Sequence, residues 1–327
     1  AAASDASSGA AAAGAAAPLP GAAADTDGDK PVRLTFDGVL EVRPLATAPG
    51  ELKHNEAFVR MTARAEGGVT AIDRASGANV SAILAEYGAT RRDVAFGSNE
   101  PMGVLLSAPG SGTAAAQRLE LSLANGRARV TGPGSLSDEA AGVDDSSRSV
   151  TWSDSADFRF AVVDGRMTGR LAEAFLSGTV RAVDAESEFN AARVQATFDP
   201  VGEKGRLARL FLAGRAWGTD GVGGQLSANT IDVRFEPESQ ESTASHPASI
   251  MARGNVVAAQ PESALWAEAL DVSLERVGGT LAATLATADG SIFFQNADGV
   301  MAQAETLTAW PIARRIELGG SSAAISK

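Results

Sequence analysis

Apolar and polar residues alternate with a period of two through most of the chain after residue 30. Four segments show the alternation clearly: AARVQATFDP (191–200), SANTIDVRFEP (227–237), AEALDVSLER (267–276) and AQAETLTAWP (302–311). Side chains point alternately to the two faces of a strand, so each segment has one apolar and one polar face. The pattern therefore predicts an almost entirely β protein.

A glycine precedes each of these strands: Gly178, Gly214, Gly254 and Gly290. We interpret each glycine as the opening of a unit that continues through a turn and a small residue into the alternating strand. The unit recurs at intervals of about 30 to 40 residues, which is typical of stacked supersecondary units. Segments 77–97 and 114–134 follow the same order, so the repeat is predicted to cover residues 31–320, with 321–327 as a tail.

Turn signals and polar insertions punctuate the repeat. Asn125-Gly126 and Asp164-Gly165 are typical of tight hairpin turns. The polar stretches 137–149 and 238–249 are predicted to be exposed loops, since insertions at turns leave the strand ladder intact. The first of them divides the repeat into two candidate lobes, 31–136 and 150–320.

Residues 1–30 consist mainly of Ala, Ser, Gly, Pro and Asp and offer almost nothing to bury. This composition predicts a disordered linker that is dispensable for folding. We expect a longer parent protein or a membrane anchor to precede it.

Composition narrows the class of protein. Aromatic residues make up only 5% of the chain and there are 35 glycines, which favours many short strands and turns. The net charge of −12 disfavours a nucleic-acid partner, which would call for a basic face. The chain has no Cys, so it can form no disulfide and no thiolate metal site. No apolar run approaches the ~20 residues of a membrane helix.

Candidate catalytic residues are few. His54 and His246, the only histidines, both lie in polar contexts that predict solvated loops. No G-x-S-x-G motif is present, and Asp144-Asp145 is interpreted as a solvated turn rather than a Ca²⁺ site. We expect a protein without enzymatic activity, metal or cofactor.

The apolar faces of successive strands form a column along the repeat. Its members include Val194, Ala196, Leu270, Val272 and Leu274. The column is either a closed core or the wall of an apolar groove between two sheets. Alternation is typical of both, and a plain core is the commoner outcome in β proteins.

The order of residues within the units resembles a known family. The segments GNVVAAQPESALWAEALDVSLE (254–275), FNAARVQATFDPVGEKGRLARLFLAG (189–214) and QLSANTIDVRFEP (225–237) resemble the unit of the OstA-like family. That family includes LptA, LptC and the N-terminal domain of LptD, which act in lipopolysaccharide transport in the periplasm. This chain has more units than a single bridge domain, and it is more acidic than the family pattern suggests.

The resemblance implies a repeat-built β-jelly-roll or folded-sheet (β-taco) stack of short antiparallel strands, solenoid-like, with an apolar groove for lipid or lipopolysaccharide. It also implies a periplasmic or other envelope location, a position peripheral to membranes, and end-to-end strand pairing with homologous β domains. The implied groove-lining residues are Phe198, Ile231, Val233, Phe235, Leu270, Val272, Leu274, Phe294 and Leu307. The alternative is a structural or adhesive β-solenoid scaffold with a closed core.

Overall fold

A computed structural model describes residues 33–36, 38–44, 57–63, 68–72, 77–88, 93–108, 112–138, 148–164, 166–184, 187–201, 204–220, 222–240, 242–321 and 323–326. These residues form strands and their connecting turns, with no helix among them, so the prediction of an all-β stack of antiparallel strands is confirmed. The predicted linker 1–30, His54 and Asp144-Asp145 lie outside the described residues.

The chain divides into two compact units, and their boundary lies between Thr179 and Val180, inside strand β13. The N-terminal unit contains β1 (Arg33–Phe36), β2 (Gly38–Pro44), β3 (Ala57–Ala63), β4 (Val69–Ile72), β5 (Asn79–Ala82), β6 (Leu84–Gly88), β7 (Asp93–Gly97), β8 (Val104–Ala108), β9 (Gly112–Ser122), β10 (Arg127–Ser137), β11 (Ser149–Trp152), β12 (Ser155–Val163) and most of β13 (Arg166–Val183). The division thus falls after the polar stretch 137–149 and not within it.

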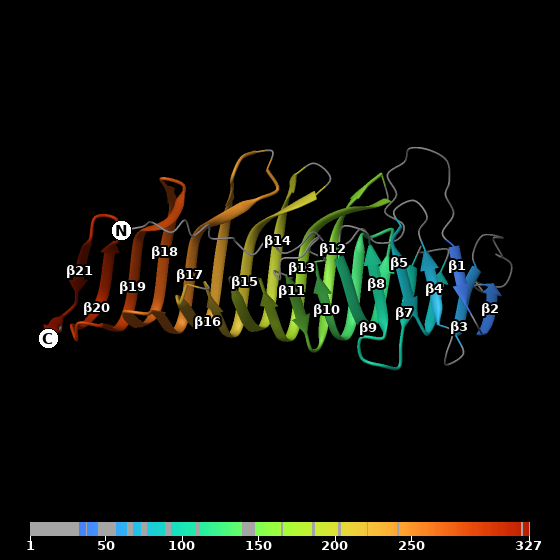
Figure 1. Ribbon diagram of the computed structural model, residues 1–327, viewed down its shortest axis with the longest axis horizontal. Helices are drawn as coiled ribbons and strands as arrows, with labels where there is room; N and C mark the ends of the chain where they lie inside the picture. The colour runs from blue at the N-terminus through green and yellow to red at the C-terminus, as the bar shows by residue number, and fades with distance from the viewer. Residues whose placement is uncertain are drawn as a thin grey trace. The chain divides into compact units, whose positions relative to one another are not determined.

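The C-terminal unit holds strands β14 to β22, of which β14 to β21 are labelled in Figure 1, coloured from yellow-green to red. They are β14 (Glu188–Val201), β15 (Lys204–Thr219), β16 (Gln225–Pro237), β17 (Ser245–Gln260), β18 (Ser263–Val277), β19 (Thr280–Asn296), β20 (Met301–Trp310), β21 (Arg315–Gly319) and β22 (Ala324–Ser326). The four alternating segments identified in the sequence fall almost entirely within β14, β16, β18 and β20, as predicted.

Two antiparallel ladders build the N-terminal unit, and we call them its A arm and B arm. The A arm runs in the order β2–β3–β6–β7–β9–β10–β12–β13. The B arm runs in the order β1–β4–β5–β8–β9–β10–β11. Strands β9 and β10 belong to both, because Arg118–Ser122 pairs with β7 while Gly112–Ala116 pairs with β8.

The A arm of the N-terminal unit presents two rows of cross-strand neighbours to its interior. The first inner row, nearer the point where strands pass between arms, contains Ala85, Phe96, Leu119, Val130, Ala156 and Leu176. All of its six members are buried. In the second inner row Leu121, Ala128, Phe158 and Ala174 are buried as well, while Val94 is half-buried and Tyr87 is 38% exposed.

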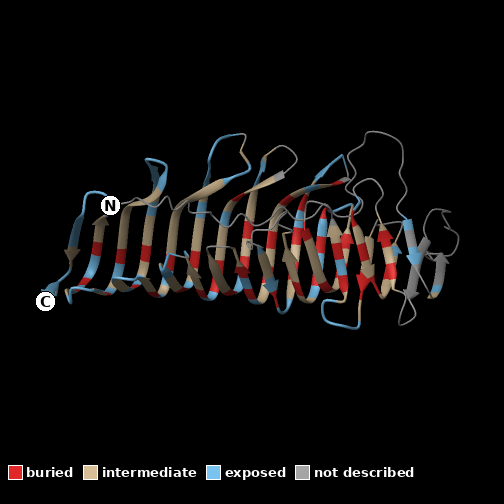
Figure 2. Cartoon of the chain, viewed as in Figure 1, coloured by how far each residue is buried: buried red, intermediate tan, exposed pale blue. Residues whose placement is uncertain are grey.

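An aromatic contact closes this interior. Trp152 on the B arm meets Phe158 on the A arm edge-on, with ring centroids 6.2 Å apart. Gly134 makes room for the indole, since a Cβ at this position would lie 2.3 Å from Trp152 Cζ2. The N-terminal unit therefore has a closed core, seen in Figure 2 as closely spaced red bands.

Hairpins in series build the C-terminal unit, and single long strands cross between its two arms. Its A arm consists of 209–213, 230–237, 245–253, 269–277, 280–289, 306–310 and 315–319. Its B arm consists of 216–219, 225–228, 256–260, 263–267, 292–296, 301–304 and 324–326. Both hairpin turns predicted in the N-terminal unit are present, between β9 and β10 and between β12 and β13.

Candidate apolar binding face

The repeated glycines lie at the bends where strands cross between arms. Gly254 has a φ of 76° and the following Asn255 a φ of 52°, and the register slips between Arg253 and Val256. Gly214 and Gly290 are followed in the same way by residues with positive φ. These are β-bulges, which bend a strand without ending it. Each glycine lies in mid-strand, so the unit counted from it begins at a bend and not at the end of a strand.

Glycine is required at the bend for two physical reasons. A left-handed backbone carries no steric cost for glycine. The facing strand also approaches closely, since a Cβ at Gly254 would lie 2.5 Å from Asn229 Nδ2, and one at Gly290 would lie 2.8 Å from the Glu268 carboxylate. The recurring glycine therefore sets where each strand folds and which residues face the interior.

The first inner row of the C-terminal A arm is buried. Its cross-strand neighbours are Leu212, Ile231, Ala252, Leu270, Ala288 and Leu307. Each of these side chains is at most 7% exposed. Three of the nine predicted lining residues, Ile231, Leu270 and Leu307, thus lie in one row next to the bend, separated by Ala252 and Ala288.

The second inner row of this arm is half-exposed along its whole length. It contains Leu210, Val233, Ile250, Val272, Ala286 and Ala309. Farther from the bend, Phe235 pairs with Pro247 and Leu274 pairs with Ala283, and both predicted residues are also half-exposed. Apolar side chains on this face therefore become more accessible to solvent with distance from the bend.

The remaining two predicted residues lie elsewhere. Phe294 is on the B arm, where its row of cross-strand neighbours includes Leu265 and Ala302. Phe198 lies in β14 and is half-exposed. The structure thus brings seven of the nine predicted residues together on the A arm and places Phe294 across the bend from them.

Sequence reasoning left Leu210, Ile250 and Leu265 out of the lining set. Leu210 and Ile250 complete the second row, and both carry the period-two signal in their own strands. Ile250 was missed because 238–249 was predicted to be a loop, whereas β17 begins at Ser245. His246 also lies in β17, so the prediction that it lies in a solvated loop was wrong. Its Nδ1 atom is buried.

Ion pairs fill the outer face of the A arm in both units. In the C-terminal unit, Arg209 Nε donates to Asp232 Oδ1 at 2.7 Å, and Arg253 Nη2 donates to Asp271 Oδ2 at 2.9 Å. These hydrogen bonds, together with the carboxylate charge, raise the pKa of both guanidinium groups. Paired charges facing solvent are consistent with the inner face being the apolar one.

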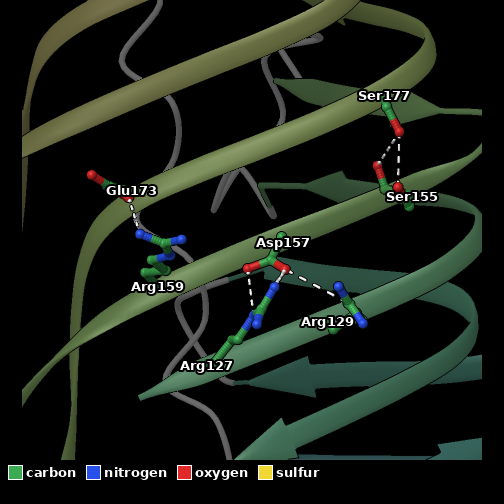
Figure 3. A network of polar contacts seen from close by, with 7 residues as sticks. All are labelled: Arg127, Arg129, Ser155, Asp157, Arg159, Glu173 and Ser177. Carbon is green, nitrogen blue, oxygen red and sulfur yellow. Dashed lines mark hydrogen bonds and ion pairs between the residues drawn. The ribbon is translucent and has the colours of Figure 1, made fainter. Parts of the chain in front are cut away.

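The N-terminal unit repeats this arrangement, as Figure 3 shows. Asp157 accepts hydrogen bonds of 2.9 Å from Arg127 Nε and forms an ion pair with Arg129, while Arg159 donates to Glu173 at 3.0 Å. Hydrogen bonding to Asp157 raises the pKa of Arg127. Exposed pairs of this kind contribute about 0.2–1 kcal/mol each to the free energy of unfolding. They therefore serve more to align neighbouring strands than to stabilise the fold.

We next consider whether the described residues are grouped in a way that would suit metal binding. No three Asp, Glu or His side chains within those ranges are grouped so as to hold a metal ion. The part of the chain that the structure describes contains no helix long and apolar enough to cross a bilayer. The graded apolar face of the C-terminal unit is the candidate functional site.

Comparison with known proteins adds no family. No protein-family model matches the chain, and no curated protein matches it.

Proposed function

We propose that the chain is a non-catalytic envelope protein that binds or conducts lipid, including lipopolysaccharide, along the inner face of its C-terminal unit. The observation that carries this proposal is the second inner row. Its six apolar side chains are only partly buried, so a ligand could cover the apolar surface that they leave open. Acyl chains fit such a face because they need apolar area and no hydrogen bonds.

The resemblance to the OstA-like unit supports the same function. In that family the corresponding face serves lipopolysaccharide transport in the periplasm, and we extend both the ligand class and the location to this chain as proposals. A neutral apolar face accepts the acyl part of such a lipid. The chain's acidity leaves the head group unassigned.

A matched pair of substitutions on β18 tests the proposal. Leu270 is buried in the first row, whereas Leu274 is half-exposed, and both point to the same face. We expect Leu274→Asp and Phe235→Asp to leave the chain folded and to abolish crosslinking to a photoreactive acyl lipid. Leu270→Asp should unfold the C-terminal unit, because an unpaired buried carboxylate costs several kcal/mol. Folded Leu274→Asp protein that still captures lipid normally would refute the proposal.

A structural or adhesive scaffold is the competing function, and the closed core of the N-terminal unit favours it. If the C-terminal face closes in the same way in solution, Leu274→Asp will aggregate or melt early, as Leu270→Asp does. That outcome would make the inner rows a core and the protein a scaffold.

We also propose end-to-end association through strand pairing. Strand β21 pairs with β20 through Arg315–Gly319, and the described residues include no strand along its other edge. Ile316 on β21 is 56% exposed and continues the second inner row beyond Ala309. Ile316→Lys should weaken self-association or pairing with a homologous domain in sedimentation experiments, while a chain that stays monomeric at high concentration would contradict the proposal.

A further inference from the structure

The outer face of the C-terminal B arm carries an uncharged strip that the proposed lipid function does not use. Its first row of cross-strand neighbours is Trp217, Ser227, Val257, Trp266, Phe293 and Gln303. Its second row includes Gln225, Ala259, Ala264, Gln295 and Met301. Neither row contains an Asp, Glu, Lys or Arg.

The outer face of the N-terminal B arm is also uncharged along the row Thr70, Ser81, Leu105, Ala115, Ser135 and Thr151, so the absence of charge is a feature of both B arms. On the outer face of the A arm of the C-terminal unit, equivalent positions hold the ion pairs Arg209–Asp232 and Arg253–Asp271. What distinguishes the strip from the uncharged face of the N-terminal unit is its exposed Trp266 ring and its exposed glutamines.

The strip carries both aromatic rings and side-chain amide groups. Trp266 is 38% exposed and leans on Phe293, with ring centroids 5.4 Å apart and planes 49° apart. Trp217 lies on β15, three strands from β18, and adjacent strands are about 4.8 Å apart. Gln225, Gln295 and Gln303 are exposed around these rings.

We infer that this strip binds a neutral saccharide chain. The C–H face of a sugar ring packs on an aromatic ring, and its hydroxyl groups pair with amides, each of which offers both donors and acceptors. Trp217 and Trp266 provide separated platforms for an extended chain, and the glutamines provide hydrogen bonds beside them. The lack of charge matches an uncharged ligand.

The same features disfavour two other occupants. Attachment to an anionic membrane surface relies on Lys and Arg, which the strip lacks, and the chain's net charge is −12. The core of an interface with a second copy is normally more apolar than a face with three exposed glutamines. Both occupants are outcomes that the test distinguishes.

The test is native electrophoresis of the full chain through gels containing hydroxyethylcellulose, dextran or galactomannan. At least one polysaccharide should retard the protein, and Trp266→Ala should raise the apparent dissociation constant about tenfold. Gln303→Ala, which leaves the aromatic contact in place, should raise it about threefold. Tyr87→Ala is the matched control, because Tyr87 is also 38% exposed but lies in the N-terminal unit, and it should have no effect.

Several results would overturn the inference. Migration unaffected by all three polysaccharides would do so, as would equal retardation of wild type and both strip variants. Binding to phosphatidylcholine vesicles that Trp266→Ala abolishes would assign the strip to a membrane surface. Self-association that the same substitution abolishes would assign it to a second copy. Acyl-lipid capture by the inner face should be unchanged in all these variants, so failure of this inference is separable from failure of the lipid proposal.

Discussion

The second inner row of the A arm is buried from Leu121 to Ala174 in the N-terminal unit, beyond the more exposed Tyr87 and Val94, whereas in the C-terminal unit none of its members is buried. Both units nevertheless have the same two-armed construction. In the N-terminal unit, Phe158 in this row meets Trp152 from the facing arm. In the C-terminal unit the row consists of aliphatic residues, and the ring pair Trp266–Phe293 lies on the outer face instead. In this fold, the direction of a few aromatic side chains therefore decides whether the two arms close over the inner face.

The bends differ between the units as well. Separate short strands such as β5 and β6 supply the two arms in much of the N-terminal unit, with Ile83 between them. In the C-terminal unit a Gly-X bulge lets a single strand serve both arms. Continuous strands make the inner rows regular from β15 to β20, which suits a long uniform face.

The largest expected effect comes from placing a carboxylate in the second row of each unit. Leu121 is 2% exposed, so Leu121→Asp buries an unpaired charge and should cost several kcal/mol, a large part of an ordinary domain's stability. Val272→Asp occupies the equivalent row but keeps access to water, and should cost about 1 kcal/mol. Denaturant midpoints measure both. Similar large losses for the two variants would remove the distinction between the units.

Truncating the closing aromatic residue should have the next largest effect. Trp152→Ala leaves a cavity between the arms of the N-terminal unit and should destabilise that unit by about 3–5 kcal/mol. Trp266→Ala is the control, because its ring is partly solvated on an outer face, and it should cost about 1 kcal/mol. Thermal unfolding followed by near-UV circular dichroism separates them, and equal losses would show that Trp152 does not close the core.

Alanine at a bend should have an intermediate effect. Gly254→Ala forces a side chain into a left-handed backbone beside Asn229 and should cost about 1–3 kcal/mol. Gly218 is in the same kind of strand with an ordinary φ, and its nearest contact to an added Cβ is 3.6 Å, so Gly218→Ala should change stability by about 0.5 kcal/mol or less. Urea titration of both variants checks this. A neutral Gly254→Ala would mean that the bend does not depend on glycine.

The smallest effect concerns the ion pair between Arg181 and Glu188 in the C-terminal unit. A hydrogen bond from Arg181 holds the pKa of Glu188 below its ordinary value of 4.5. A carboxylate with a lowered folded-state pKa stabilises the fold above its unfolded pKa and loses that contribution as the pH falls through the folded value. Glu188→Gln should therefore lower the melting temperature slightly at pH 7 and leave it unchanged near pH 3. A deficit that persists at pH 3 would contradict this linkage.

Much of the fold was predictable, because period-two alternation is a local signal. The four alternating segments, the hairpins at Asn125-Gly126 and Asp164-Gly165, and the inward direction of Val272 and Leu274 all follow from it. The role of Gly254 did not follow. A glycine in a bulge and a glycine in a turn look alike along the sequence, and only the close approach of Asn229 distinguishes them.

The different burial of the second inner row in the two units could not be predicted from the sequence either. Alternation says which side chains share a face, but it does not say whether the opposite arm supplies a partner for them. Trp152 meets Phe158 from the other arm because β10 pairs with both β11 and β12, and Gly134 on β10 leaves room for the indole. Strand pairing of this kind determines how far each row is buried, which alternation alone does not give.

Single-cysteine labelling tests the central claim most directly, since the chain contains no Cys of its own. Leu121→Cys and Val272→Cys place one thiol in the second inner row of each unit. With a water-soluble maleimide under native conditions, we predict rapid labelling of Val272→Cys, slowed by a saturating fatty acid, and labelling of Leu121→Cys only after unfolding. Slow labelling at Val272→Cys, or rapid labelling that fatty acid does not slow, would contradict an open, acyl-binding face in the C-terminal unit.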